Sequence, residues 1–320
     1  MHTPHVTKLS VVGAGAVGSS TAYAALIRGS AGLVALTDID EARAHAEVLD
    51  LQHGTQFTGS SRMLDDVSLD GTANSDVVVI TAGAKQKPGE SRLALVQTNV
   101  RIIESLMPQL VERSPKAKFV IVSNPCDVLA TVAQRISGLP ENQVFASGTV
   151  LDSSRLRVLL GQRAGVAPSS VHAYIVGEHG DSEFPLWSSA SIGTVPILDW
   201  QSNGPRFTID ELAQTADDVR NAAYAIIQGK GATNYAIGLS AARIVEAILG
   251  DENAVLPVST VLNGQYGVSG VALSVPHLVN RDGAFPIPGV PFSTTESAQF
   301  SASANTLLET LASVGYAPST

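Results

Sequence analysis

The chain has 320 residues, of which 44% are hydrophobic and 15% are charged, and its formal net charge is −9. This length is enough for one large or two medium globular domains, and the acidic balance gives no long-range attraction for nucleic acid. No apolar run approaches the roughly 18 residues of a membrane-spanning helix, so we expect neither a nucleic-acid nor a membrane partner.

The N-terminal residues and the cysteine content bear on the cellular compartment. No positively charged region is followed by a long apolar run, so we expect no signal peptide. The single cysteine, Cys126, excludes an intrachain disulfide, and we expect it to be a buried packing residue. These features together favour a cytoplasmic protein.

Strand and helix patterns alternate in the first half of the chain. Short apolar runs predict strands at 8–13, 33–40, 75–83 and 118–125. Helical periodicity between these runs predicts helices at 16–29, 41–54 and 91–112. Because strands that alternate with helices form parallel sheets with right-handed crossovers, we predict an α/β fold.

The pattern changes beyond residue 150. A helix is expected at 151–165, followed by shorter strands with more turns and then by helices at 210–228 and 232–250. Strands around 254–262 and 270–279 and a last helix at 296–314 complete the chain. We predict two domains, a doubly wound parallel sheet at residues 1–150 and an α+β domain at residues 151–320.

A glycine-rich turn follows the first predicted strand. In "VVGAGAVGS", Gly13, Gly15 and Gly18 have G-x-G-x-x-G spacing between a strand and a helix. Such glycines permit a tight turn and the close approach of a pyrophosphate to the start of the helix. Asp38, at the end of the second strand, can accept ribose hydroxyl groups and would repel a 2′-phosphate. We therefore predict a Rossmann domain that binds NAD; the alternative is a structural turn and a surface aspartate.

Four segments carry polar residues suited to catalysis. They place Gln86 and Arg92 in a loop that could close as a lid, Asn124 at the carboxyl end of a strand, Asp152 and Arg155 three apart on a helix, and His179 in "GEHGDS". A lone histidine is more often structural, and an Asp–Arg pair at this spacing is more often a surface ion pair. Beside an NAD site, however, they suit hydride transfer to a carbonyl, which needs a proton donor, an orienting carboxylate and a guanidinium for a substrate carboxylate.

Over nearly its whole length the chain resembles the L-lactate and malate dehydrogenase family. The resemblance lies in "VVGAGAVG", "TAGAKQKPGESR", "SNPCD", "LDSSRLR", "GEHGDSEFPLW" and "KGATNYAIG", which occur in the family's order. It implies reversible hydride transfer between NADH and pyruvate, with malate dehydrogenase activity as the alternative. Gln86 favours pyruvate, because the family's malate enzymes have an arginine there, which pairs with the second carboxylate of oxaloacetate.

The resemblance also implies roles for individual residues. His179 would donate the proton, Asp152 would orient it, and Arg92 would polarise the carbonyl. Substrate-binding residues would be Gln86, Arg92, Asn124, Arg155 and Thr233. NAD would contact Gly13, Gly15, Val17, Gly18, Asp38, Thr81, Gly83, Asn124 and Ile237.

A second anion site is implied by two further positions. Arg157 and His172 match residues that bind fructose 1,6-bisphosphate between subunits of the allosteric bacterial lactate dehydrogenases, which are tetramers. Arg157 lies about 200° around the helix from Arg155, so the two arginines cannot serve one ligand. The alternative is a solvated arginine and a histidine that simply begins a strand.

The same residues bear on two other classes of protein. A metal-using NAD-dependent glycosidase would need a Cys/His metal site and a catalytic tyrosine, and His45, His53 and His277 lack metal-ligand spacing. We therefore predict no metal. A silent NAD-binding protein would have lost part of the reactive set, which is intact here.

Overall fold

The computed structural model describes residues 5–59, 61–84, 91–201 and 206–317, apart from the side chain of Arg92. In the first half, the four predicted strands and three predicted helices are β1 (Lys8–Val12), α1 (Ala16–Arg28), β2 (Leu33–Thr37), α2 (Glu41–Gly54), β4 (Val77–Ile80), α3 (Arg92–Arg113) and β5 (Lys118–Ile121). The structure adds β3 (Arg62–Met63), α4 (Cys126–Ser137) and β6 (Val144–Ala146), which the sequence analysis did not predict.

The second half begins with a helix and continues with short strands. Its elements are α5 (Val150–Ala164), β7 (Val171–His172), β8 (Ile175–Val176), β9 (Phe184–Pro185), β10 (Ser191–Ile192), β11 (Val195–Pro196), α6 (Ile209–Lys230), α7 (Tyr235–Leu249), β12 (Ala254–Leu256), β13 (Ser259–Asn263), β14 (Ser269–Ser274), β15 (His277–Asn280), β16 (Gly283–Pro286) and α8 (Thr294–Ser313). The single strand expected at 270–279 is thus two strands, because the chain leaves one sheet at Val275–Pro276 and enters another.

The largest sheet has eight strands in the order β14-β13-β6-β5-β4-β1-β2-β3. The six strands from β6 to β3 run parallel, which confirms the doubly wound Rossmann prediction. The hairpin of β13 and β14 extends this sheet antiparallel to β6, through the pairing of Ser259 with Ala146. The sheet therefore continues past residue 150, and the domain boundary placed there stays a prediction.

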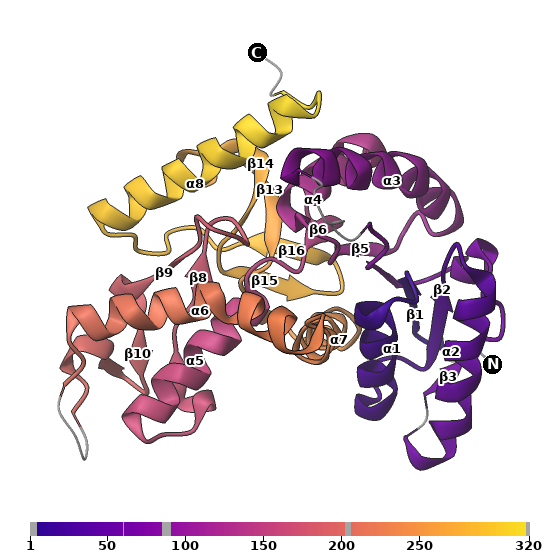
Figure 1. Cartoon of the computed structure of the whole chain (residues 1–320), viewed down its shortest axis with the longest axis horizontal. Helices are drawn as coiled ribbons and strands as arrows, with labels where there is room; N and C mark the ends of the chain where they lie inside the picture. Colours follow the sequence, from indigo (N-terminus) through magenta and orange to yellow (C-terminus); the bar gives the residue numbers. More distant parts are fainter. Residues whose placement is uncertain (1–4, 60, 85–90, 202–205, 318–320) are drawn as a thin grey trace.

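Helices cover both faces of the sheet (Figure 1). Alternate residues of β4 point to opposite sides: Val77 and Val79 join the cluster formed with α1 and α7, whereas Val78 and Ile80 join the cluster formed with α3, α4 and α8. All four are fully buried, as the continuous apolar run predicts for a central parallel strand. A third apolar cluster joins α5, α6 and the small sheet β11-β10-β7.

Candidate active site

The glycine-rich turn joins the end of β1 to the start of α1. Gly13 has φ +109°, which residues with a side chain rarely adopt, and its N–H donates to the Thr37 carbonyl at 2.7 Å. A Cβ on Gly18 would lie 1.7 Å from the Gly13 carbonyl oxygen, so α1 can approach the turn only without a side chain there. The Thr81 hydroxyl donates to the same oxygen at 2.9 Å. The ends of β1, β2 and β4 together fix the turn.

The first turn of α1 is open to an anion. Gly15 is the N-cap and provides no side-chain hydrogen bond to the first N–H groups, and a Cβ built on it would meet nothing within 4 Å. No acidic side chain lies in this turn. The positive end of the helix therefore faces open space, which suits the pyrophosphate of a dinucleotide.

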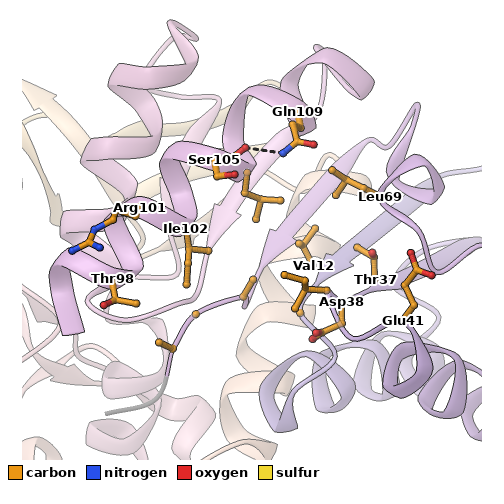
Figure 2. A pocket seen from close by; sticks show the side chains of 16 residues that line it. Val12, Thr37, Asp38, Glu41, Leu69, Thr98, Arg101, Ile102, Ser105 and Gln109 are labelled. Atoms are coloured by element: carbon orange, nitrogen blue, oxygen red, sulfur yellow. Dashed lines mark hydrogen bonds between the residues drawn. The ribbon is translucent and has the colours of Figure 1, made fainter. Parts of the chain in front are cut away.

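A cavity of about 780 Å³ lies beside the turn, between the carboxyl ends of β1 and β2 and helix α3 (Figure 2). Asp38 lies in its wall; Oδ2 accepts the Ala14 N–H at 2.6 Å and Oδ1 accepts the Asp40 N–H at 3.0 Å. These bonds hold the carboxylate where its remaining lone pairs can accept ribose hydroxyl groups. Gly13 and Gly83 line the same cavity, so three of the predicted cofactor residues meet in one place.

Two other predicted cofactor residues lie on helices α1 and α7, which pack against each other. Ile237, in the first turn of α7, and Val17, in α1, are both half-buried and pack against the same apolar cluster. The start of α7 is tied to α1, because the Asn234 amide donates to the Ser20 hydroxyl at 2.8 Å. A Cβ on Gly238 would lie 2.8 Å from the Ser20 backbone, so the two helices touch closely here.

His179, Asp152 and Arg155 form a continuous polar chain. His179 Nδ1 lies 2.6 Å from Asp152 Oδ2, and the Arg155 guanidinium donates to Asp152 Oδ1 at 2.7 Å. Asp152 is buried, whereas a quarter of the His179 side chain is exposed. The Asp152 charge raises the pKa of His179 to about 10 against the effect of burial. Burial alone would raise the pKa of Asp152, but His179 and Arg155 outweigh it and lower that pKa.

Asp127 is a part of this site that the sequence reasoning missed. Its Oδ2 accepts the backbone N–H of His179 at 2.7 Å, and its side chain is buried at the start of α4. Burial raises the pKa of this carboxyl to about 6. It stands in the same "SNPCD" segment as Asn124, so an acid next to a proposed site residue was the available sequence signal.

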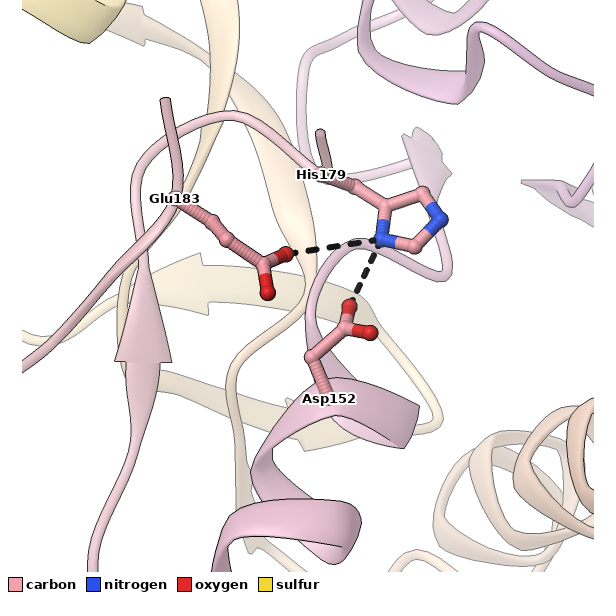
Figure 3. Close-up of side chains that lie close together, drawn as sticks. All are labelled: Asp152, His179 and Glu183. Atoms are coloured by element: carbon pink, nitrogen blue, oxygen red, sulfur yellow. Dashed lines mark hydrogen bonds and ion pairs between the residues drawn. The ribbon is translucent and has the colours of Figure 1, made fainter. Parts of the chain in front are cut away.

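Glu183 is a second acid that was missed. It is 4% exposed, and its Oε2 lies 4.0 Å from His179 Nδ1 (Figure 3). Burial raises the pKa of Glu183 to about 8, and the charge of Asp152 acts in the same direction. Glu183 follows His179 by four positions in "GEHGDSEF", but no sequence pattern indicates that its side chain is buried.

Four predicted site residues remain: Asn124, Thr233, Arg92 and Gln86. Asn124 is exposed just beyond the carboxyl end of β5, and its carbonyl accepts the Asn99 amide at 2.8 Å. Thr233 is half-buried two residues before α7. Arg92 is the first residue of α3, and only its backbone is described. Gln86 lies outside the described residues.

Arg157 and His172 lie on two elements that pack together, Arg157 on α5 and His172 in β7. Arg157 Nε donates to the Ala173 carbonyl at 3.0 Å, and its guanidinium lies 4.8 Å from the centre of the Tyr174 ring. His172 is exposed in the strand residue before Ala173. The fold therefore brings Arg157 to the two residues that directly follow His172 in the chain.

In the part of the chain that the structure describes, the group Asp152, His179 and Glu183 has ligand atoms within 4.8 Å of one another, as a metal ion would need. The short bond to Asp152 already uses Nδ1 of His179, the ring nitrogen that such an ion would bind. The absence of a metal stays a prediction.

Comparison with known proteins decides the family. Residues 7–146 match the NAD binding domain of lactate/malate dehydrogenase, and residues 149–315 match the alpha/beta C-terminal domain of the same family. The chain belongs to the lactate/malate dehydrogenase family. It is an NAD-dependent dehydrogenase, so the predicted family, fold and cofactor are confirmed.

Relatives of this dehydrogenase match it from end to end. It is 50% identical to an L-lactate dehydrogenase of Bifidobacterium animalis subsp. lactis, over 97% of this chain and 98% of that one, and 43% identical to one of Bacillus velezensis, over 98% of each. A lactate dehydrogenase from a Medee basin deep-sea metagenome superposes with a TM-score of 0.93 at 38% identity, over 97% of this chain and 99% of that chain. The minor L-lactate dehydrogenase of Enterococcus mundtii gives the same TM-score at 39% identity, over 97% and 98%. No helix among the described residues is long and apolar enough to cross a membrane.

Proposed function

We propose that this dehydrogenase interconverts pyruvate and L-lactate. The observation that carries the proposal is the hydrogen-bonded chain of His179, Asp152 and Arg155, which offers a proton, its orientation and a cation for a carboxylate in one place. The relatives described above are named lactate dehydrogenases, which supports pyruvate over oxaloacetate.

His179 is the proton donor and acceptor of the proposed reaction. The nicotinamide cofactor held by this chain would supply the redox chemistry, with NADH as hydride donor for pyruvate and NAD+ as hydride acceptor for L-lactate. Asp152 accepts the Nδ1 proton of His179, so Nε2 is the atom that gives a proton to the ketone oxygen of pyruvate and takes it back from L-lactate. Because Asp152 is buried and its charge favours the imidazolium, the ring holds this proton at neutral pH.

The substrate carboxylate is assigned to Arg155. One terminal nitrogen of its guanidinium bonds Asp152, and the remaining N–H donors have no partner among the described residues. A planar guanidinium can bind a carboxylate through two of them. We assign Arg92 and Asn124 to the ketone oxygen and Thr233 to the substrate's surroundings, in line with the family.

Gln86 is the proposed selector between the two substrates of the family. An uncharged amide leaves the second carboxylate of oxaloacetate unpaired in the site, whereas pyruvate places only a methyl group there. A Gln86→Arg variant should therefore gain preference for oxaloacetate. An unchanged ratio of the two kcat/KM values would contradict this role.

In this proposal, the first half of the chain binds the cofactor and the second half provides the acid/base and carboxylate-binding residues. Residues 1–150 hold NAD, because the turn, the cavity and Asp38 all lie there. Residues 151–320 supply the acid/base histidine and the carboxylate site, together with Ile237 for the nicotinamide side.

Arg157 and His172 are proposed as an effector site for fructose 1,6-bisphosphate between subunits of a homotetramer. The Ala173 carbonyl and the Tyr174 ring hold Arg157 beside the two residues that follow the exposed His172. Copies of this strand that meet across a two-fold axis would bring like positive charges together. A bisphosphate would neutralise them and favour the assembled, active form.

One assay tests these assignments together. NADH oxidation by the purified protein is followed with pyruvate or oxaloacetate, each with and without fructose 1,6-bisphosphate. We expect a preference for pyruvate that the bisphosphate increases. Preference for oxaloacetate would overturn the substrate and leave the hydride chemistry standing. If neither the rate nor the stability of the tetramer responds to the bisphosphate, the effector site is wrong.

A further inference from the structure

Glu183 is a buried acid that the proposed reaction does not use. It lies just before β9, 4% exposed, and its Oε1 has no hydrogen-bond partner among the described residues. Its Oε2 lies 4.0 Å from His179 Nδ1. Burying a carboxyl without a full set of hydrogen bonds costs free energy, so packing alone does not explain an acid at this position.

The geometry around the ring shows how Glu183 acts. Nδ1 of His179 already bonds Asp152 at 2.6 Å, and at 4.0 Å the Glu183 carboxyl is too far for a second hydrogen bond. Its influence is therefore electrostatic. Figure 3 shows both carboxyl groups at the Nδ1 edge of the ring, with the other ring nitrogen pointing away from them. Glu183 thus lies on the Nδ1 side of the ring. Its charge acts through the ring on Nε2, the nitrogen that would exchange protons with substrate.

We propose that Glu183 is a positioning residue that sets how firmly His179 holds its proton, while Asp152 orients the ring. The inference rests on the function proposed above for His179. It deepens that function by naming the group that controls its working pH.

The protonation of Glu183 supports this role. Burial raises its pKa to about 8, so the carboxyl is mostly neutral at neutral pH. When it ionises in alkaline solution, its negative charge stabilises the protonated form of His179. The effect is reciprocal, because protonated His179 lowers the pKa of Glu183.

The other charged groups around the pair come from three helices and a loop. They are Asp127 on α4, Asp152 and Arg155 on α5, Arg220 on α6, and Glu178 beside His179 in the loop. The two arginines favour the ionised form of Glu183, whereas Asp152 opposes it. Arg220 also donates to the Glu183 carbonyl at 3.2 Å, which fixes this segment against α6.

A Glu183→Gln variant separates charge from packing, because glutamine keeps the size of the side chain but cannot ionise. The pH profile of kcat/KM is measured in both directions for the wild type and for this variant. We expect the alkaline loss of pyruvate reduction to move to lower pH by about one unit, which is a roughly tenfold lower rate on that limb. Lactate oxidation, which needs neutral His179, should begin at lower pH by the same amount.

At a given alkaline pH the variant should reduce pyruvate more slowly and oxidise lactate faster than the wild type. These opposite changes in rate distinguish the electrostatic role from a structural one. A loosened site would lower both activities at every pH without moving either limb, and that result would overturn the proposal. Glu309→Gln is the matched control, since it removes the same charge from an exposed position of α8. Its profiles should match those of the wild type.

A second measurement does not depend on the substrate. The imidazole of His179 is titrated by NMR in the wild type, in Glu183→Gln and in Glu309→Gln. A lower midpoint in Glu183→Gln alone supports the inference, even if pyruvate is not the substrate. Equal midpoints in all three proteins, or a higher midpoint in Glu183→Gln, would overturn it.

Discussion

The backbone N–H of His179 donates to Asp127 Oδ2 at 2.7 Å, while the ring of the same residue bonds Asp152. The histidine is therefore fixed at its main chain from α4 and at its side chain from α5. Helix α4 belongs to the first half of the chain and follows directly on Asn124. Through its buried Asp127, the first half therefore helps to fix the position of the proposed proton donor.

Asp127→Ala removes the acceptor for the part-buried backbone N–H of His179. We expect a loss of about 2 kcal/mol in the free energy of unfolding, because that N–H is left without a partner, and a fall in kcat/KM of about tenfold. Asp127→Asn keeps an oxygen that can accept the same N–H and should retain most of both. Urea unfolding and steady-state kinetics measure the two quantities. If the asparagine and alanine variants are equally impaired, the hydrogen bond is not the reason for the acid.

Asp152→Asn keeps the shape of the side chain but removes its charge. The pKa of His179 should fall, because the Asp152 charge is the largest factor that raises it. Loss of general acid catalysis of this kind costs roughly 10²–10⁴-fold in pyruvate reduction, with the alkaline limb moved to lower pH. Asp70→Asn is the control, since Asp70 also pairs with an arginine, at 2.6 Å, but is exposed. Full activity of Asp152→Asn at neutral pH would refute the assigned role.

Two glycine variants separate cofactor binding from folding. In Gly15→Ala the new Cβ meets no protein atom within 4 Å, so the melting temperature of the free protein should hardly change. The methyl group occupies the space assigned to the pyrophosphate, so NADH should bind at least tenfold more weakly. In Gly18→Ala the Cβ would clash with the Gly13 oxygen, and the free protein itself should be destabilised. NADH fluorescence titration and thermal unfolding provide the comparison. Unweakened NADH binding by Gly15→Ala would argue against this placement.

His277 predicts a loss of stability in acid. It is fully buried between the Thr260 hydroxyl and the Val275 carbonyl, and burial lowers its pKa to about 4. The unfolded chain takes up a proton near pH 6.5 and the folded one only near pH 4, so the free energy of unfolding falls between these values. The loss is about 3 kcal/mol in total.

Urea unfolding from pH 7 to pH 4, at one protein concentration, measures this loss. His277→Gln should flatten the pH dependence, whereas the exposed control His45→Gln should leave it as in the wild type. An equally steep dependence in His277→Gln would assign the acid sensitivity to other groups.

Local patterns in the sequence predicted the Rossmann half well. The glycine spacing, the strand before it and Asp38 at the end of the next strand are all determined within about 25 residues, and hydrophobic runs reveal strands that are buried on both faces. The His179–Asp152 pair was accessible only through the family resemblance, because nothing local shows that two segments so far apart in sequence meet.

Other features depend on tertiary contacts that no local pattern encodes. Aspartate and glutamate side chains usually lie at the surface, so the sequence gives no sign that Asp127 and Glu183 are buried. In the structure both are buried beside His179. The break of the expected strand at Val275–Pro276 arises because the chain changes sheets there. The antiparallel pairing of β13 with β6 joins residues that all of α5, α6 and α7 separate in sequence.

That pairing has a consequence for any attempt to produce the cofactor half alone. A fragment that ends at residue 150 would leave β6 as an edge strand, with unpaired backbone groups on the side that β13 now covers. It would also lose α7 and α8 from the two faces of the sheet and expose the apolar side chains beneath them. Such a fragment would be prone to aggregate through its open edge. The second half of the chain therefore also protects the edge strand of the first half.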